Sequence, residues 1–128
     1  MQIAKYIATL VNSGEEVNPT IIKTIINADG TEVSKEEIEQ FSSEKLGITN
    51  EQKQEIFEIK PENLAAILEG MRSVTSETGG TAYSVFKDFN IEVGGKTGSA
   101  QAGDEVNAWF VGFAPFDTPE VVVVAMVE

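Results

Sequence analysis

Two stretches of the chain carry apolar residues at intervals of three and four, which is the spacing of an amphipathic helix. The first predicts a helix over residues 2–12, which Asn12-Ser13-Gly14 ends. The second predicts a helix over residues 61–74, with Pro61 in its first turn. Two capping-box pairs predict shorter helices over residues 35–41 and 50–57. These pairs are Ser34 with Glu37 and Thr49 with Gln52.

The last third of the chain has the residue pattern of three β-strands. Short turns at residues 101–105 and 116–119 separate these strands, so they should form an antiparallel meander. The predicted strands span residues 91–101, 108–114 and 121–127. Val121 to Val124 lack polar alternation, which predicts a strand buried on both faces beneath covering helices. The predicted fold class is α+β, an antiparallel sheet of three C-terminal strands covered by helices.

Between the two long predicted helices, the residue pattern predicts a β-hairpin. Pro19 to Ile26 is rich in β-branched residues and predicts a strand. Asp29-Gly30 is typical of a hairpin turn, and residues 31–33 would return from it. Residues 76–90 show neither period and are predicted to form a loop or a short turn.

Composition narrows the possible chemistry. The net charge is −12, which disfavours nucleic acid as a partner because phosphate backbones would be repelled. Cysteine and histidine are both absent, so the chain has no disulfide, no Cys/His metal site and no Ser-His-Asp apparatus. Acid–base chemistry would have to use a lysine or a carboxylate. The longest apolar run, Val121 to Val127, is far shorter than the roughly 20 residues of a membrane-spanning helix.

The segment Gly94-Gly95-Lys96-Thr97-Gly98-Ser99-Ala100-Gln101 allows two interpretations. One is the end of a phosphate-binding P-loop, which requires glycine at position 90 and a helix after the Lys-Thr pair. The chain has Asn90 instead, and Gly98 with Gly103-Asp104 favours a strand and a turn. The other is the Lys-Thr-Gly strand of the serine acyltransferases that react with penicillin.

The surrounding sequence favours the second interpretation. The Lys-Thr-Gly triplet is followed by AWFVGFAP and VVVVAMVE, and the stretch from Val93 to Glu128 resembles the class B penicillin-binding proteins. MQIAKYIATLVNSG and PENLAAILEGMRSVTSETGGTAYSVF resemble two helices that precede this strand in the same family. The resemblance covers most of the chain and is weakest between Asp29 and Ile59. Among class B proteins the chain looks most like the elongation-type penicillin-binding protein 2.

The resemblance implies a role for each residue of the strand. Lys96 would supply positive charge to the terminal carboxylate of a peptide, and the hydroxyls of Thr97 and Ser99 would supply hydrogen bonds. Gly98 would leave room for the nucleophile, and the Ser99 backbone N–H would form half of the oxyanion hole. The family more often has threonine where Ser99 stands, and serine keeps the hydroxyl. An exposed strand edge would let an extended peptide pair with this strand.

The family's nucleophile is the serine of an S-x-x-K motif, whose lysine activates it. Ser42-Ser43-Glu44-Lys45 matches that pattern, but its flanks are polar, and it lies too close to Lys96 to leave room for a middle motif. No S-x-N triplet occurs in the chain. We therefore expect residues 1–128 to be the C-terminal segment of one transpeptidase domain, with the nucleophile upstream of Met1. Alone, this segment would be inactive.

The resemblance also implies the function of the whole protein to which this chain would belong. It would be a D,D-transpeptidase that binds D-Ala-D-Ala stem peptides and β-lactam antibiotics and uses no cofactor or metal. An N-terminal anchor outside this chain would hold it at the outer face of the cell membrane, and a glycosyltransferase would be its partner. Two alternatives stay open: a non-catalytic module that binds wall peptides or penicillin, and a related carboxypeptidase or β-lactamase.

We expect the other aromatic and acidic residues near the motif to have structural rather than catalytic roles. Trp109, Phe110 and Phe113 are predicted to lie in the core of the sheet. Tyr83 and Phe86 would anchor their loop rather than line an active site. Asp104 and Glu105 would lie in a solvated turn.

Overall fold

The computed structural model describes residues 1–17, 19, 24–46 and 57–128 of the chain. They fall into two compact units, one formed by Met1–Val17 with Ile56–Glu128 and the other by Asn18–Glu55. The first unit holds a sheet and the helices α1 (Gln2–Val11), α3 (Pro61–Ser76) and α4 (Tyr83–Phe86). The second holds α2 (Lys35–Leu46) and a hairpin. No helix in the described part of the chain is long and apolar enough to cross a membrane.

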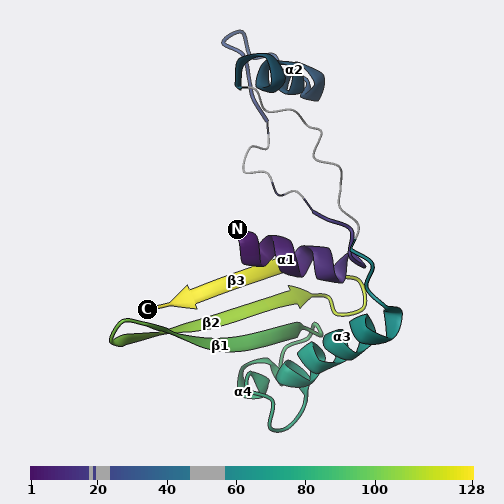
Figure 1. The fold of residues 1–128 in the computed structure, drawn as a ribbon, viewed down its shortest axis with the longest axis vertical. Helices are drawn as coiled ribbons and strands as arrows, with labels where there is room; N and C mark the ends of the chain where they lie inside the picture. The colour runs from purple at the N-terminus through teal and green to yellow at the C-terminus, as the bar shows by residue number, and fades with distance from the viewer. Residues whose placement is uncertain (18, 20–23, 47–56) are drawn as a thin grey trace. The chain divides into compact units, whose positions relative to one another are not determined.

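The sheet of the first unit has three antiparallel strands in the order β1-β2-β3 (Figure 1). The strands are β1 (Gly94–Ala102), β2 (Glu105–Ala114) and β3 (Val121–Val127). The predicted meander is therefore confirmed, with β1 beginning three residues later and β2 three residues earlier than predicted. The short helix α4 within the predicted loop was not expected.

One face of the sheet carries the core of this unit. The cross-strand register places Val111, Phe113 and Val122 on this face, because neighbouring partners in a sheet share a side. Helix α1 packs against β2 and β3, and α3 packs against β1. Phe113 is 2% exposed and forms the buried cluster with residues of both helices. The other members of this buried cluster are Ile7, Leu10 and Met71.

The opposite face of the sheet is only partly covered. The Phe86 ring of α4 stacks on Phe110 of β2, with ring centroids 5.4 Å apart. On β3, by contrast, Val121 and Val123 are each more than half exposed. The prediction that this strand is buried on both faces is wrong for the described structure. Val121 to Val124 alternate in burial because α1 packs against one side of this strand.

The end of α1 brings residue 57 into the first unit. The helix ends at Val11, as the Asn12-Ser13-Gly14 sequence predicts, and Gly14 adopts a φ of +91° that favours glycine. The Phe57 N–H donates to the Gly14 carbonyl at 3.0 Å. This bond aligns the chain leading to α3 beside the end of α1.

The second unit confirms two local predictions. Ile26 pairs with Glu32 in an antiparallel bridge across the predicted turn. The Ser34 N–H donates to the Glu37 carboxylate at 3.0 Å, and the Glu37 N–H donates to the Ser34 hydroxyl at 3.2 Å, which completes the predicted capping box. Helix α2 continues to Leu46, five residues past the prediction. The predicted helix over residues 50–57, apart from Phe57, and residues 20–23 of the predicted strand over residues 19–26 lie outside the described residues.

Candidate functional site: the Lys96 strand

The Lys96-Thr97-Gly98 triplet lies on β1, an edge strand of the sheet. β1 pairs with β2 along one side, and no other strand in the described structure pairs with its second side. A turn at Gly103 and then β2 follow it. The P-loop interpretation is therefore wrong, because it requires a helix directly after Lys96 and Thr97.

Close packing fixes the start of β1. The buried Thr75 hydroxyl, at the end of α3, donates to the Val93 carbonyl at 2.5 Å. Gly94 lies against the Phe113 ring, and Gly95 lies against the Phe110 ring and the Thr75 methyl group. A Cβ at either glycine would overlap a ring. The two glycines therefore let aromatic side chains cover the strand immediately before Lys96.

Gly98 has different surroundings from these two glycines. A Cβ built at Gly98 would meet only the Trp109 Cβ, at the ordinary contact distance of 3.6 Å. Internal packing does not require a glycine at this position. The strand therefore leaves free space at Gly98, on the face that this residue shares with Trp109.

Successive side chains of β1 leave the strand on alternate faces. Lys96 shares its face with Val111, whereas Thr97 shares the other face with Phe110 and Ser99 with Ala108. The Lys96 ammonium nevertheless returns to the backbone, where it donates to the Thr97 carbonyl at 2.5 Å. The structure thus brings the Lys96 ammonium and Thr97 together, while the Ser99 side chain is exposed further along the strand.

Thr81 is a neighbour of the site that sequence reasoning missed. Its hydroxyl lies 2.7 Å from the Thr97 hydroxyl, and either oxygen can be the donor. Thr81 belongs to the loop between α3 and α4, sixteen residues before Thr97. The Gly79-Gly80 pair before it was the available signal, because glycines often mark a loop that packs closely on a neighbouring element.

Two hollows meet at Lys96. One has a volume of 430 Å³ and borders the α3–α4 loop; its lining includes Ser73, Glu77, Thr81 and Lys96. The other has a volume of 540 Å³ and is mainly apolar, with Tyr6, Leu10, Met71 and Val111 among its lining residues. Lys96 therefore stands between a hollow whose lining includes several hydroxyl groups and an apolar groove between α1 and α3.

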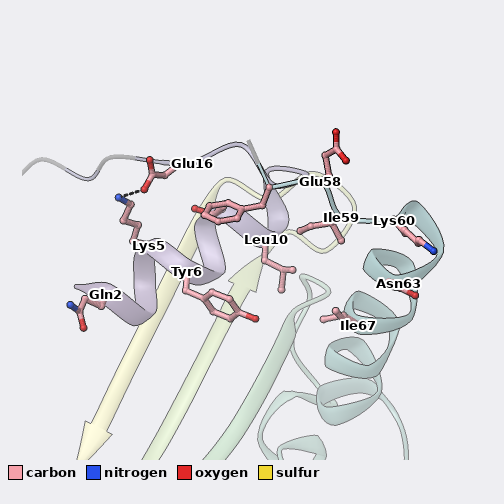
Figure 2. A pocket seen from close by; sticks show the side chains of 12 residues that line it. Gln2, Lys5, Tyr6, Leu10, Glu16, Glu58, Ile59, Lys60, Asn63 and Ile67 are labelled. Carbon is pink, nitrogen blue, oxygen red and sulfur yellow. Dashed lines mark ion pairs between the residues drawn. The ribbon is translucent and has the colours of Figure 1, made fainter. Parts of the chain in front are cut away.

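A larger hollow, of 780 Å³, lies away from the strand (Figure 2). Figure 2 shows it between α1 and the segment that leads into α3, with the Lys5–Glu16 ion pair at its side. Tyr6, Leu10 and Ile67 line both this hollow and the apolar groove that reaches Lys96. The two hollows form one apolar depression along α1, and its chemistry is that of a packing surface rather than a catalytic centre.

Arg72 is engaged in structural contacts. Its guanidinium donates to Glu92 at 2.6 Å and lies 5.5 Å from the centroid of the Phe116 ring. The hydrogen bond and the charge of Glu92 raise the pKa of Arg72, with a smaller contribution from Glu69. The guanidinium thus joins α3 to the segment before β1. Within the described part of the chain, no cluster of acidic groups could hold a metal ion.

The remaining predicted residues have mixed outcomes. Phe113 is core, as predicted, whereas Trp109 and Phe110 are half-buried. Phe86 packs on Phe110 and Phe89, which confirms that it anchors its loop. Asp104 and Glu105 are exposed at the β1–β2 turn, as expected. The Ser42-to-Lys45 match lies on α2, and the side chains of its Ser42 and Lys45 are outside the described structure.

A sheet covered by helices on one face, with a Lys-Thr-Gly triplet on its edge strand, defines a transpeptidase fold of the penicillin-binding type. The chain belongs to this family, because the model of the penicillin binding protein transpeptidase domain matches residues 1–128. The α+β fold class and the recognition of the family are both confirmed.

Individual relatives are of the penicillin-binding protein 2 type, as predicted. The peptidoglycan D,D-transpeptidase MrdA of Haemophilus influenzae is 28% identical over 144 residues, which cover 100% of this chain and 20% of that protein. Penicillin-binding protein H of Bacillus subtilis is 29% identical over 132 residues, covering 94% of this chain and 17% of that protein. The crystal structure of Pseudomonas aeruginosa PBP2 matches 99% of this chain and 25% of its own, with 30% identity and a TM-score of 0.74. The chain thus spans about a fifth of the curated relatives' length.

Proposed function

We propose that this chain is the C-terminal part of a D,D-transpeptidase domain that cross-links peptidoglycan through a serine acyl-enzyme and is acylated by penicillin. Membership of the transpeptidase family and the similarity to MrdA support this proposal. The observation that carries it is the position of Lys96 on an edge strand, beside a hollow lined by hydroxyl groups.

In this proposal Lys96, Thr97 and Ser99 hold the terminal carboxylate of the donor stem peptide or of the β-lactam. The carboxylate replaces the Thr97 carbonyl as the acceptor of the Lys96 ammonium, because a hydrogen bond between two charged groups is stronger than one to a neutral carbonyl. The Thr97 hydroxyl donates a further bond. The unpaired side of β1 is available for main-chain pairing with an extended peptide.

Gly98 and Ser99 serve the acyl transfer itself. The space at Gly98 admits the reacting carbonyl and the nucleophile without a side chain between them. The Ser99 N–H then donates to the oxyanion of the tetrahedral intermediate, with the nucleophile's own N–H as the second donor. Loss of one such donor in other acyltransferases costs about 3–4 kcal/mol of transition-state stabilisation.

The nucleophilic serine and its lysine belong to a part of the domain outside this chain. The apolar groove that ends at Lys96 is the surface against which that part packs. This chain alone is then inactive. The whole protein would be anchored in the cell membrane, act at its outer face and work beside a glycosyltransferase.

Labelling with a fluorescent penicillin tests the proposal. The full-length protein should form a covalent band, and the chain of residues 1–128 should not. A covalent adduct on Ser42 of the short chain would show that the Ser42-to-Lys45 match is the working motif and that the proposed location of the nucleophile is wrong.

Substitution of Lys96 in the full-length protein tests the carboxylate site. Lys96→Ala should slow acylation about 10- to 100-fold, because a hydrogen bond to a charged group is lost. Lys87→Ala, at an exposed lysine outside β1, is the matched control and should leave the rate unchanged. Equal rates for the two variants would refute the assignment of Lys96. Analysis of the products separates the alternatives, since a transpeptidase forms cross-linked dimers whereas a carboxypeptidase releases only free D-Ala.

A further inference from the structure

Thr81 is placed to act on the carboxylate site through Thr97. The two hydroxyl oxygens are 2.7 Å apart, which is the usual length of an O–H···O hydrogen bond. Thr81 also lines the 430 Å³ hollow that Lys96 lines, so it lies beside the same stretch of β1. The hydroxyl pair therefore borders the proposed binding site.

The loop that carries Thr81 is firmly attached to the end of α3. The Ala82 N–H donates to the Val74 carbonyl at 3.0 Å, and the Ala82 side chain is buried. Gly80 packs directly against the carbonyl groups of Ser73 and Val74, where a Cβ would overlap them. Because Thr75 joins the same helix end to Val93, both Thr81 and Thr97 are positioned by the end of α3.

The direction of the hydrogen bond between Thr81 and Thr97 depends on what Thr97 binds. Each threonine hydroxyl has one hydrogen to donate, whereas a carboxylate can only accept. Once Thr97 donates its hydrogen to a carboxylate, the bond between the two hydroxyls persists only if Thr81 is the donor. The pair then forms a chain in one direction, from Thr81 to Thr97 to the carboxylate, and each bond polarises the next.

We propose that Thr81 is a positioning residue, which orients the Thr97 hydroxyl toward the carboxylate of the donor substrate. This inference rests on the proposed function of the Lys96 strand. Its substrate class is a peptide or β-lactam with a free carboxylate. Thr81 itself does not touch the reacting atoms, so its effect depends on Thr97 being present.

A double-mutant cycle in the full-length protein, read as the acylation rate with benzylpenicillin, tests this dependence. Thr81→Val should slow acylation about 3- to 10-fold, and Thr81→Ser should restore the rate to within about 2-fold of the unchanged protein. In a Thr97→Val background, Thr81→Val should have no further effect. The methyl ester of benzylpenicillin, which lacks the carboxylate, should react slowly and at the same rate with and without Thr81→Val.

Controls separate a positioning role from a structural one. Thr118→Val, at an exposed turn, should leave every rate unchanged. If Thr81→Val does not fold, Thr81→Ala takes its place in the cycle. Equal slowing by Thr81→Val with and without the Thr97 hydroxyl would overturn the inference, because the two residues would then act independently.

The failure of this inference differs from the failure of the proposed function. If Lys96→Ala and Thr97→Val slow acylation but Thr81→Val does not, only the role of Thr81 is wrong. If none of the three changes the rate, the carboxylate site itself is wrong.

Discussion

The two units of this chain are stabilised in opposite ways. In the unit of residues 1–17 and 57–128, contacts join segments that are far apart in sequence, as Leu10, Met71 and Phe113 do in one buried cluster. In the unit of residues 18–55, the described contacts join near neighbours, as Ser34 and Glu37 do, and none of the described residues is buried. The same chain thus combines a region stabilised by burial with a region stabilised by local hydrogen bonds. A perturbation should therefore stay within its own region.

Removal of the largest buried side chain should have the largest effect and tests whether the two units unfold separately. Phe113→Ala should destabilise the first unit by about 3–5 kcal/mol, because it leaves a cavity between β2 and the two helices. Hydrogen exchange measured on peptides of the full-length protein should show faster exchange throughout β1 to β3 and unchanged exchange in α2. Phe41→Ala in α2, where the ring is 59% exposed, is the matched control and should change stability by no more than about 0.5 kcal/mol.

An equal rise in exchange in α2 after Phe113→Ala would show that the two units unfold together. The two units would then differ in the kind of contacts they contain but would not be independent in stability.

The same division explains what the sequence could and could not predict. The capping box at Ser34 and Glu37 was predictable because its two residues meet within one helical turn. The Lys96 strand was predictable from its motif, and its edge position followed from the order of a meander. These signals are all local or follow from short connections.

Features that depend on the packing of distant segments were missed. The exposed side of β3 could not be predicted from Val121 to Val124, because the spacing of apolar residues does not tell how many helices cover a sheet. The Thr81–Thr97 pair was missed because it depends on how the loop after α3 folds back on β1. The start of β1 was predicted three residues early, since the side-chain bond from Thr75 that fixes it carries no local signal.

Thr75→Val should destabilise the first unit by a smaller amount than Phe113→Ala. The substitution keeps the shape of the side chain but leaves the Val93 carbonyl without its hydrogen bond, and Thr75 is only 2% exposed. An unpaired buried polar group costs about 1–3 kcal/mol. Denaturant unfolding of the full-length protein should show this loss, and exchange should rise most at the start of β1. Thr75→Ser keeps the hydroxyl and should recover most of the stability; if it does not, the hydrogen bond is not the cause.

Ser34→Ala tests the local side of the comparison. Loss of the N-cap hydroxyl should destabilise α2 by about 1 kcal/mol, because the Glu37 N–H loses its acceptor. The effect should appear as faster exchange in the first turn of α2 and nowhere in β1 to β3. Ser34→Thr retains a capping hydroxyl and serves as the control. Faster exchange in the sheet would contradict the independence of the two units.

The smallest expected effect is the response of the hairpin to acid. The Asp29 carboxylate accepts hydrogen bonds from the Thr31 hydroxyl at 2.6 Å and from the Thr31 N–H at 2.9 Å, which lower the pKa of Asp29 below its ordinary value of 3.8. Because the folded form has the lower pKa, this stabilisation is complete above pH 3.8 and is lost as the pH falls through the folded value. The Thr31 amide resonance should therefore shift in acid in the unchanged protein. In Asp29→Asn, which has no ionisable group at this position, the shift should be absent. A Thr31 amide that titrates equally in both proteins would mean that another group controls the turn, whereas a difference confined to residues near the hairpin would confirm that this region responds only to its neighbours in sequence.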